Sequence, residues 1–242
     1  MSDGIYVALS GALAQTTLLE TTANNLANAT TDGYQRVRPV FQEMLTRATG
    51  GTTPDRPSAV TVATTALDRS AGAQRPTGRA LDATLPEGVY MAVSTARGER
   101  YTRAVSLSLG PDGTVRTAQG ESVANESGQP LRVATGAGDV TLTADGELRR
   151  GATSLGRLKL VRFDGPDPLT HEGGTLLTAR GTPTPATGVE LALGTVEESN
   201  ATTVGAMTDM VTATRTFDAF QRVIEVFREA DRRVVTTVPS SG

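Results

Sequence analysis

Few residues of this 242-residue chain could carry out catalysis. His171 is the only histidine, and it lies in a stretch rich in Pro and Gly, without the nucleophile-elbow pattern of a serine hydrolase. A Ser-His-Asp triad would have to use this residue, so we expect a loop histidine with no part in catalysis. The chain has no cysteine, which excludes disulfides, thiolate catalysis and Cys-ligated metal sites.

No nucleotide-binding or metal-binding motif is present in the sequence. It contains no Walker loop, no dinucleotide fingerprint and no cluster with the spacing of metal ligands. Asp164, Asp167 and Glu172 are close in sequence but lack the spacing of a calcium loop. We therefore predict no catalytic, cofactor-binding or metal-binding residue, no cofactor and no small-molecule substrate.

The composition narrows the class of protein further. Hydrophobic residues make up 38% of the chain and aromatic residues only 4%, which is lean for one compact globule and fits apolar stripes that neighbouring subunits complete. The net charge of -3 is small, so we expect no nucleic-acid or acidic-membrane partner. No run of about 20 apolar residues could span a bilayer. The first basic residue is Arg36, so a secretory signal peptide is not expected either, and these features alone predict a cytoplasmic protein.

An apolar stripe at the start of the chain predicts an amphipathic helix over residues 3 to about 29, because its members recur at alternating spacings of four and three. A stripe this narrow is typical of a coiled coil; the alternative is an N-terminal helix packed on its own domain. The turn signal Asp32-Gly33 follows the helix. The stripe consists of Ile5, Leu9, Ala12, Thr16, Leu19, Ala23 and Leu26.

A matching stripe at the other end predicts a long helix over residues 204 to 237, with Asn200, Thr202 and Thr203 as plausible N-caps. Asp231 lies on this stripe, either as a solvated residue near the helix end or as a polar residue that sets the register of a coiled coil. The stripe consists of Met210, Ala213, Phe217, Phe220, Ile224, Phe227, Asp231 and Val234.

Between the helices, the sequence predicts a linker followed by a β-rich domain. Residues 35–75 have little periodicity and are rich in Thr, Arg, Gly and Pro, with one candidate strand at residues 60–63. From residue 76 to about 190, short apolar runs alternate with turn signals such as Pro111-Asp112-Gly113 and Ala144-Asp145-Gly146. This alternation is typical of an antiparallel sandwich or barrel-like domain.

The predicted fold class is therefore α+β, in which paired, coiled-coil-like N- and C-terminal helices flank an antiparallel β-rich domain. The chain is expected to divide into an axial core domain made of two separate segments, a linker and an outer domain. The axial core domain consists of an N-terminal helix over residues 1–34 and a C-terminal helix over 191–242. The linker covers residues 35–75, and the β-rich outer domain covers 76–190.

Short motifs near both ends resemble those of bacterial flagellar rod and hook proteins. Residues 23–28 and 31–36 are similar to that family's A-N-N-[IL]-A-N and T-x-G-[FY]-[KQ]-R motifs, and residues 194–200 to its G-x-[LV]-E-x-S-N motif. Residues 78–82 and 101–104 also resemble segments of its β-domain. The motif residues at the two ends are Asn24, Asn25, Asn28, Thr31, Gly33, Tyr34, Glu197, Ser199 and Asn200.

The resemblance implies a structural rod subunit that is not an enzyme. Such subunits are exported unfolded by the flagellar type III apparatus, without a cleaved signal peptide, and assemble in the periplasmic space into a helical drive shaft that transmits torque. This replaces the cytoplasmic prediction. The implied partners are further copies of the chain, other rod and hook proteins and the export apparatus. Chain length and the segment Arg215-Thr216-Phe217 resemble a proximal rod protein more than a distal one.

The resemblance also makes both apolar stripes, Thr16 excepted, candidate assembly interfaces. Two departures from the family pattern, at residues 87–91 and 201–202, leave the subtype open. The alternatives are a distal rod or hook-basal homologue, and, from a different class, a secreted β-rich binding or adhesin module. An enzyme that depends on His171 or on an Asp cluster ranks last.

Overall fold

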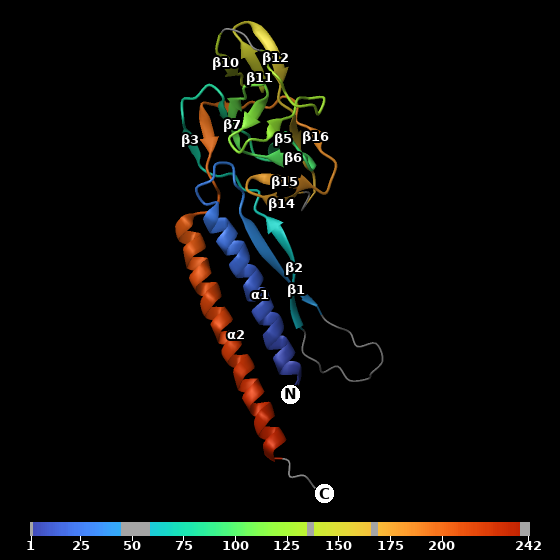
Figure 1. Ribbon diagram of the computed structural model, residues 1–242, viewed down its shortest axis with the longest axis vertical. Coiled ribbons are helices and arrows are strands. Elements are labelled where there is room, and N and C mark those ends of the chain that lie inside the picture. The colour runs from blue at the N-terminus through green and yellow to red at the C-terminus, as the bar shows by residue number, and fades with distance from the viewer. Residues whose placement is uncertain (1, 45–58, 135–137, 166–168, 238–242) are drawn as a thin grey trace. The chain divides into compact units, whose positions relative to one another are not determined.

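Figure 1 shows the computed structural model, which describes residues 2–44, 59–134, 138–165 and 169–237; within these, the side chains of residues 2–6, 41–44, 59–64, 231 and 234–237 are not described. The chain divides into two compact units. The helical unit comprises Met1–Leu26, Val37–Ala66 and Thr203–Gly242, and the β-rich unit comprises Ala27–Arg36 and Leu67–Thr202. Two terminal helices and antiparallel strands confirm the α+β class.

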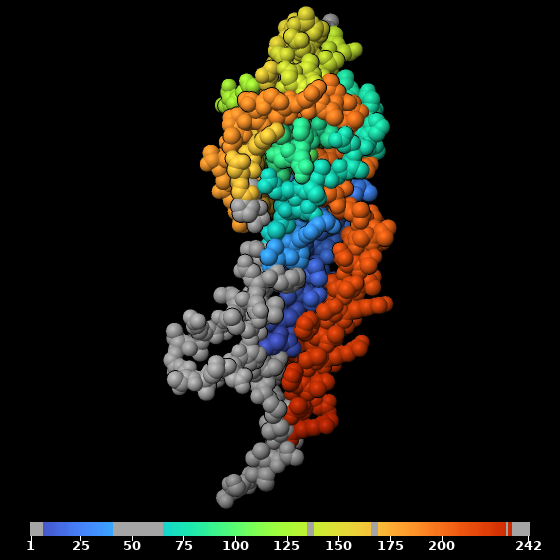
Figure 2. Space-filling model, turned by 180° about the vertical axis from the view of Figure 1, so that it is seen from behind, coloured from blue at the N-terminus to red at the C-terminus, as the bar shows by residue number. Residues whose placement is uncertain are grey.

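The helical unit contains two long helices and one pair of strands. α1 spans Ser2–Ala27 and α2 spans Thr203–Thr237, while β1 (Val37–Met44) pairs with β2 (Ala59–Leu67). The helices run side by side in Figure 1, and their side chains are in contact in Figure 2. β1 and β2 lie where the sequence suggested a linker, because each strand satisfies backbone hydrogen bonds of the other, a pairing that local periodicity does not reveal.

The two helices meet at a glycine. A Cβ atom on Gly11 of α1 would lie 2.5 Å from a ring carbon of Phe220 on α2, so the ring packs directly against the α1 backbone. Ala8 and Ala12 of α1 and Ala213 of α2 are buried. The separation of packed helices depends on the side chains at the contact, and the small residues here allow a close approach.

The face of α1 that is buried within the chain is rotated from the predicted stripe. Ala12 is buried, but Leu9 is 46% exposed and Ala23 is also exposed. Small residues such as Ala8 and Ala14 line the buried face instead, since they admit neighbouring backbone more closely than leucine does. Part of the stripe on α1 therefore remains open to solvent.

On α2 the predicted stripe coincides with the least exposed face of the helix. Ala213 is buried, and the other described members are half-buried: Met210, Phe217, Phe220, Ile224 and Phe227. The side chains of Ile5, Asp231 and Val234 lie outside the described residues.

The β-rich unit is built from short strands, and every pairing among them is antiparallel. The largest sheet has the order β14-β15-β6-β5-β9-β8-β7-β4-β17, with β13 joining β5 to β16; β10-β11-β12 and β18-β3 form two smaller sheets. The strands are β3 Gln74–Pro76, β4 Asp82–Thr84, β5 Val89–Thr95, β6 Gly98–Thr102, β7 Val105–Leu109, β8 Val115–Thr117, β9 Ser122–Val123, β10 Val140–Leu142, β11 Glu147–Arg150, β12 Thr153–Arg157, β13 Leu160–Arg162, β14 Leu169–Gly173, β15 Leu176–Ala179, β16 Thr184–Pro185, β17 Ala192–Leu193 and β18 Thr195–Glu197.

The Asp-Gly turns predicted from the sequence connect neighbouring strands. Gly113 lies between β7 and β8 with a φ of 74°, and Gly146 lies between β10 and β11 with a φ of 79°. Glycine adopts this left-handed conformation without the steric cost that a Cβ atom imposes. The turn chemistry in the sequence therefore determines where these hairpins reverse.

Strand β5 lies at the centre of the core of the β-rich unit. Val89, Met91 and Val93 pack into one apolar cluster, while Tyr90 and Ala92 pack into a second. Alternate residues of a strand point to opposite faces of the sheet, so the continuous apolar run of β5 means that both of its faces are covered. Among the described residues, no helix is long and apolar enough to cross a membrane.

Candidate functional site

The motif residues Gly33, Tyr34, Glu197 and Asn200 meet in the β-rich unit. The Gly33 amide donates to the Glu197 carbonyl at 2.6 Å, and the Asn200 amide donates to the Tyr34 carbonyl at 3.3 Å. A third segment joins them, because the Asp68 amide donates to the Arg36 carbonyl at 2.9 Å. We call these three segments, residues 28–36, 68–76 and 195–200, the junction.

Gly33 allows the first of these segments to approach the core. Its φ is 75°, and a Cβ atom there would lie 2.4 Å from the backbone nitrogen of Ala104. A larger residue would therefore be strained by its backbone conformation and would also overlap the chain next to it. The backbone conformation and the close approach to Ala104 explain why glycine occupies this position of the motif, which the sequence pattern alone did not reveal.

Asn200 joins all three segments through its side-chain amide. Its Oδ1 accepts a hydrogen bond from the Arg36 amide at 2.7 Å, and its Nδ2 donates to the carbonyls of Asp68 and Ser70, each at 2.9 Å. The sequence suggested Asn200 as a plausible N-cap, but α2 begins at Thr203 and these three bonds use both ends of the amide. The Asn200 side chain therefore links the three segments of the junction by hydrogen bonds.

We expect Asn200→Asp to destabilise the β-rich unit by about 1–3 kcal/mol, because a carboxylate cannot donate to the two carbonyls and would leave them facing a negative charge. Chemical denaturation followed by circular dichroism would measure the change. Asn125→Asp is a matched control, since Asn125 Oδ1 only accepts, from the amides of Ser127 and Gln129. Equal stability of the two variants would show that the hydrogen bonds of the Asn200 side chain do not hold the three segments together.

Beneath the junction lies a buried ion pair between Arg103 and Glu197, whose side chains are 1% and 2% exposed. Arg103 Nε lies 2.9 Å from Glu197 Oε2, and Arg103 Nη2 lies 2.5 Å from the same oxygen. The remaining donors of the guanidinium reach three main-chain carbonyls, those of Leu85, Pro86 and Val89. Every hydrogen-bond donor of the guanidinium is thereby used.

Glu197 is equally well satisfied, since its Oε1 also accepts from the Gly72 amide at 3.0 Å. The guanidinium carbon of Arg103 lies 5.8 Å from the centre of the Tyr90 ring. The family resemblance included residues 101–104, but sequence reasoning did not identify Arg103 as a site residue. The available signal was an arginine directly before the apolar alternation that begins at Ala104, because a cation can be buried there only if an anion elsewhere in the chain pairs with it.

Tyr34 and Asp68 show how burial and charge act within the junction. Tyr34 is 1% exposed, and burial raises its pKa to about 12. Burial acts to raise the pKa of Asp68 as well, but hydrogen bonds from Arg36 and Ser70 outweigh it, so that this pKa lies below its ordinary value. Tyr34 therefore stays neutral and Asp68 ionised near neutral pH.

His171 packs against the junction and lies in strand β14, so the expectation of a loop histidine is wrong. Its ring meets the Tyr34 ring edge-on, with 5.4 Å between ring centres, and its Nε2 lies 2.8 Å from the Gly174 carbonyl. The local sequence indicated a loop rather than a strand at His171, because Pro and Gly residues lie on both sides of it.

The other motif residues make shorter-range contacts. In the helical unit, Asn25 pairs its side-chain amide with both the N–H and the C=O of Val37, at 2.9 and 2.8 Å. In the β-rich unit, the Thr31 amide donates to the Asn28 carbonyl, and Ser199 Oγ accepts from the Ala201 amide. Asn24 is exposed. These contacts fix the backbone, and none of them creates a reactive group.

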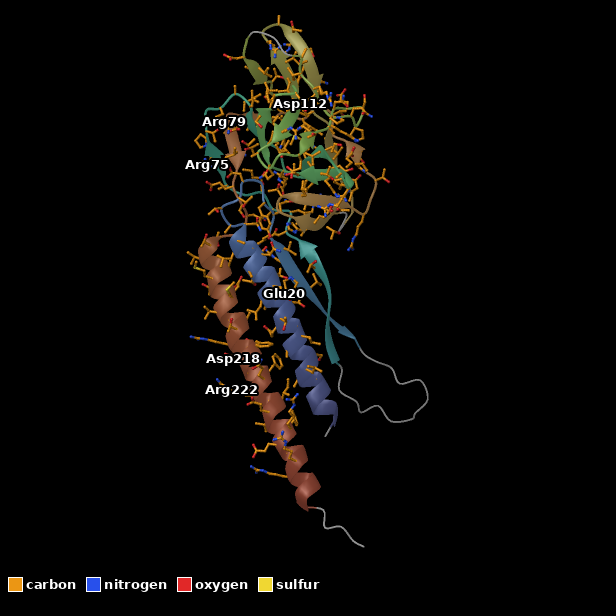
Figure 3. All side chains as sticks on the ribbon, in the orientation of Figure 1. Glu20, Arg75, Arg79, Asp112, Asp218 and Arg222 are labelled. Atoms are coloured by element: carbon orange, nitrogen blue, oxygen red, sulfur yellow. The ribbon has the colours of Figure 1, made fainter. Side chains whose placement is uncertain are left out.

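Arg75, labelled in Figure 3, adds an ionic link on the exposed side of the junction. It donates to Asp32 at 3.1 Å and to Glu198 at 3.0 Å, which joins the first and third segments to β3. Within the described part of the chain, no group of three or more His, Asp or Glu residues could hold a metal ion.

A second ionic cluster holds the β14–β15 hairpin to β6. Hydrogen bonds from Arg100 and Thr178 lower the pKa of Glu172 from 4.5 to about 2, and Arg97 also pairs with this carboxylate. A carboxyl group whose pKa falls on folding contributes stability above its unfolded pKa and loses that contribution as the pH falls through its folded pKa.

We therefore expect the stability difference between the natural chain and Glu172→Gln to shrink as the pH falls from 4.5 to about 2. Urea denaturation at a series of pH values would measure it. A difference that stayed constant over this range would show that ionised Glu172 contributes nothing to folding.

The two ends of the chain match models of known families. Residues 5–35 match the model described as flagella basal body rod protein, and residues 192–237 match the model described as flagellar basal body rod FlgEFG protein C-terminal. Both matched segments include part of the junction and one of the two helices.

Whole-length relatives point the same way. The chain is 30% identical to the flagellar basal-body rod protein FlgF of Mesorhizobium japonicum, over 100% of both chains. It is 33% identical to FlgF of Escherichia coli over 93% of each chain. Similarity to FlgG of Bacillus subtilis is lower, at 28% identity over 97% of this chain and 98% of the relative. Among these relatives, the chain is more similar to the two FlgF proteins.

Proposed function

Since this chain belongs to the flagellar basal-body rod protein family, we propose that it is a non-enzymatic subunit of the rod that assembles through its terminal helices and transmits torque. The proximal rod is the favoured position, because the FlgF relatives are more similar than the FlgG relative. The proposed partners are further copies of this chain, other rod and hook proteins and the flagellar type III export apparatus.

The observation that carries this proposal is the structure of the two matched ends. Residues 5–35 contain most of α1 and residues 192–237 contain all of α2, and the two helices pack on each other where Phe220 meets Gly11. Apolar side chains such as Leu9 and Leu13 of α1 nevertheless remain 46% and 61% exposed. Burying these side chains against neighbouring subunits would contribute about 1.5–3 kcal/mol for each fully buried residue, which favours assembly over the free chain.

The hydrogen bonds and the ion pair of the junction support a role in transmitting force within the β-rich unit. Arg103, Glu197 and Asn200 connect segments that are distant in sequence through short, directional bonds, and the ion pair is shielded from water. Charge-assisted hydrogen bonds are stronger than neutral ones, so the backbone at this point resists displacement. A subunit that passes torque to its neighbours needs such a rigid connection.

Two other positions in the same assembly follow from the similarity to FlgG: a distal rod protein or a hook-basal homologue. For all of these we propose location in the flagellar basal body, in the periplasmic rod, and export by the type III apparatus without cleavage of a signal peptide. The alternative from a different class of protein is a secreted β-rich binding or adhesin module.

Deletion of the gene for this chain, followed by swimming assays and imaging of basal bodies, tests the proposal. We expect loss of swimming and basal bodies that end below the hook, with the point of truncation separating the proximal from the distal position. Normal swimming with intact basal bodies would overturn the rod assignment and favour the binding module.

A further inference from the structure

One segment joins many of the separate parts of the β-rich unit to one another. It spans residues 186–200, contains β17 and β18 and ends at the junction, and we call it the strap. It lies close to the C-terminal end of the unit, which is Thr202. In Figure 2 the orange atoms of this part of the chain cross one face of the β-rich unit. The strap is therefore the last part of the unit's core to be synthesised.

The strap meets its partners in reverse sequence order. The Ala186 amide donates to the Leu160 carbonyl at 2.9 Å, and the Leu191 amide donates to the Ala144 carbonyl at 2.7 Å. β17 then pairs with β4, and β18 pairs with β3. At its end, the Asn200 side chain reaches the first segment of the junction. The strap thereby connects β13, the turn before β11, β4, β3 and the junction.

Until the strap is in place, Arg103 lacks the anion that pairs with it in the folded unit. Its guanidinium also reaches the carbonyls of Leu85 and Val89, at the start of β5, but these are neutral. Burying a cation without its counter-ion is strongly unfavourable, even where neutral acceptors are present. Without Glu197 of the strap, the guanidinium must therefore stay in water, which prevents the chain before β5 from closing over it.

The strap also completes the apolar core. Val189 and Leu191 belong to the cluster that contains one face of β5, and Val196 is buried as well. The strap fits closely against the chain beside it, because a Cβ atom on Gly72 would overlap the carbonyl oxygen of Glu198. Without the strap, the rest of the unit would have an incomplete core in addition to an unpaired cation.

We propose that docking of the strap is the step that folds the β-rich unit, and that residues 67–185 form no stable sheet before it. A chain synthesised from its N-terminus contains Arg103 long before Glu197, so the unit stays open over most of its synthesis. Contacts between segments distant in sequence also slow folding. The inference rests on the proposed function, because a subunit that is exported unfolded benefits from a unit that closes late.

Pulsed hydrogen exchange during refolding of the purified full chain tests the order of events. We expect the amides of Ala92 in β5 and Val115 in β8 to gain protection in the same kinetic phase as those of Leu191 and Glu198. All four donate to main-chain carbonyls in the folded unit. Isolated hairpins are marginal in water and give no lasting protection. Protection of Ala92 and Val115 in a phase before that of the strap would overturn the proposal.

Two matched substitutions in the full chain test how far the closed unit depends on the strap. Glu197→Gln and Glu99→Gln each remove one carboxylate from an ion pair, with Arg103 and Lys159 respectively, but Glu99 lies in β6, ahead of the strap. We expect Glu197→Gln to lower the equilibrium protection of the Ala92 amide by about a hundredfold or more. Glu99→Gln should lower it by less than about tenfold, because that pair is partly exposed.

A different pattern of protection would contradict this dependence. If Glu197→Gln lowered protection only within residues 186–200, and Ala92 kept the protection it has in the natural chain, the sheet would be stable without a docked strap. That result would overturn the proposal even if the strap docked in the same kinetic phase as the sheet.

The inference and the proposed function fail in different ways. If the purified chain protects β5 before the strap docks, the inference is wrong and the rod assignment is untouched. If deletion of the gene leaves swimming and basal bodies intact, the rod assignment is wrong, and the benefit of late closure for export is overturned with it.

Discussion

Arg103→Ala is expected to destabilise the β-rich unit by about 3–5 kcal/mol, because it would leave the carboxylate of Glu197 buried without its counter-ion. The same substitution removes the guanidinium donors to the carbonyls of Leu85, Pro86 and Val89. Glu197→Ala should be comparably damaging, since it would strand a buried guanidinium. Guanidinium chloride denaturation of the purified full chain measures both.

Arg157→Ala is the matched control for this prediction. Arg157 also pairs with carboxylates, Asp145 at 2.9 Å and Glu126 at 3.8 Å, but its side chain is 48% exposed. Water can replace those partners, so we expect a much smaller loss of stability. If Arg103→Ala and Arg157→Ala unfolded at the same denaturant concentration, the buried pair would have no special part in holding the junction together.

Gly11→Val is expected to abolish swimming while leaving the β-rich unit folded. A Cβ atom at this position would already lie 2.5 Å from the Phe220 ring, and valine adds two further methyl groups. Overpacking of this kind typically costs about 1–3 kcal/mol, and relief here requires α1 and α2 to separate or the ring to move. Either change would alter the helical surface that neighbouring subunits are proposed to contact.

A compensating substitution makes this prediction specific. Phe220→Ala removes the ring that Gly11→Val would strike, so the double variant should swim better than Gly11→Val alone. Ala219→Val adds the same two methyl groups at an exposed position of α2 and should leave swimming intact. If Phe220→Ala brought no recovery, the defect of Gly11→Val would have to arise from something other than this contact.

Local chemistry was enough to predict the two terminal helices and two of the hairpin turns. The three-four spacing of apolar residues predicted both terminal helices, and the structure extends them over Ser2–Ala27 and Thr203–Thr237. Asp112-Gly113 and Asp145-Gly146 predicted the hairpin turns, because glycine supplies the positive φ that each turn requires. Information of this kind resides in a few consecutive residues and needs no knowledge of the fold.

Contacts between distant segments depended on the tertiary structure. Arg103 and Glu197 are 94 residues apart, and neither residue type predicts burial until its partner is known. The pairing of β1 with β2, the position of His171 in β14 and the rotation of the buried face of α1 were likewise decided by what packs against each element. Periodicity reports the propensity of a segment, whereas its neighbours determine which of its faces is buried and which of its charges is paired.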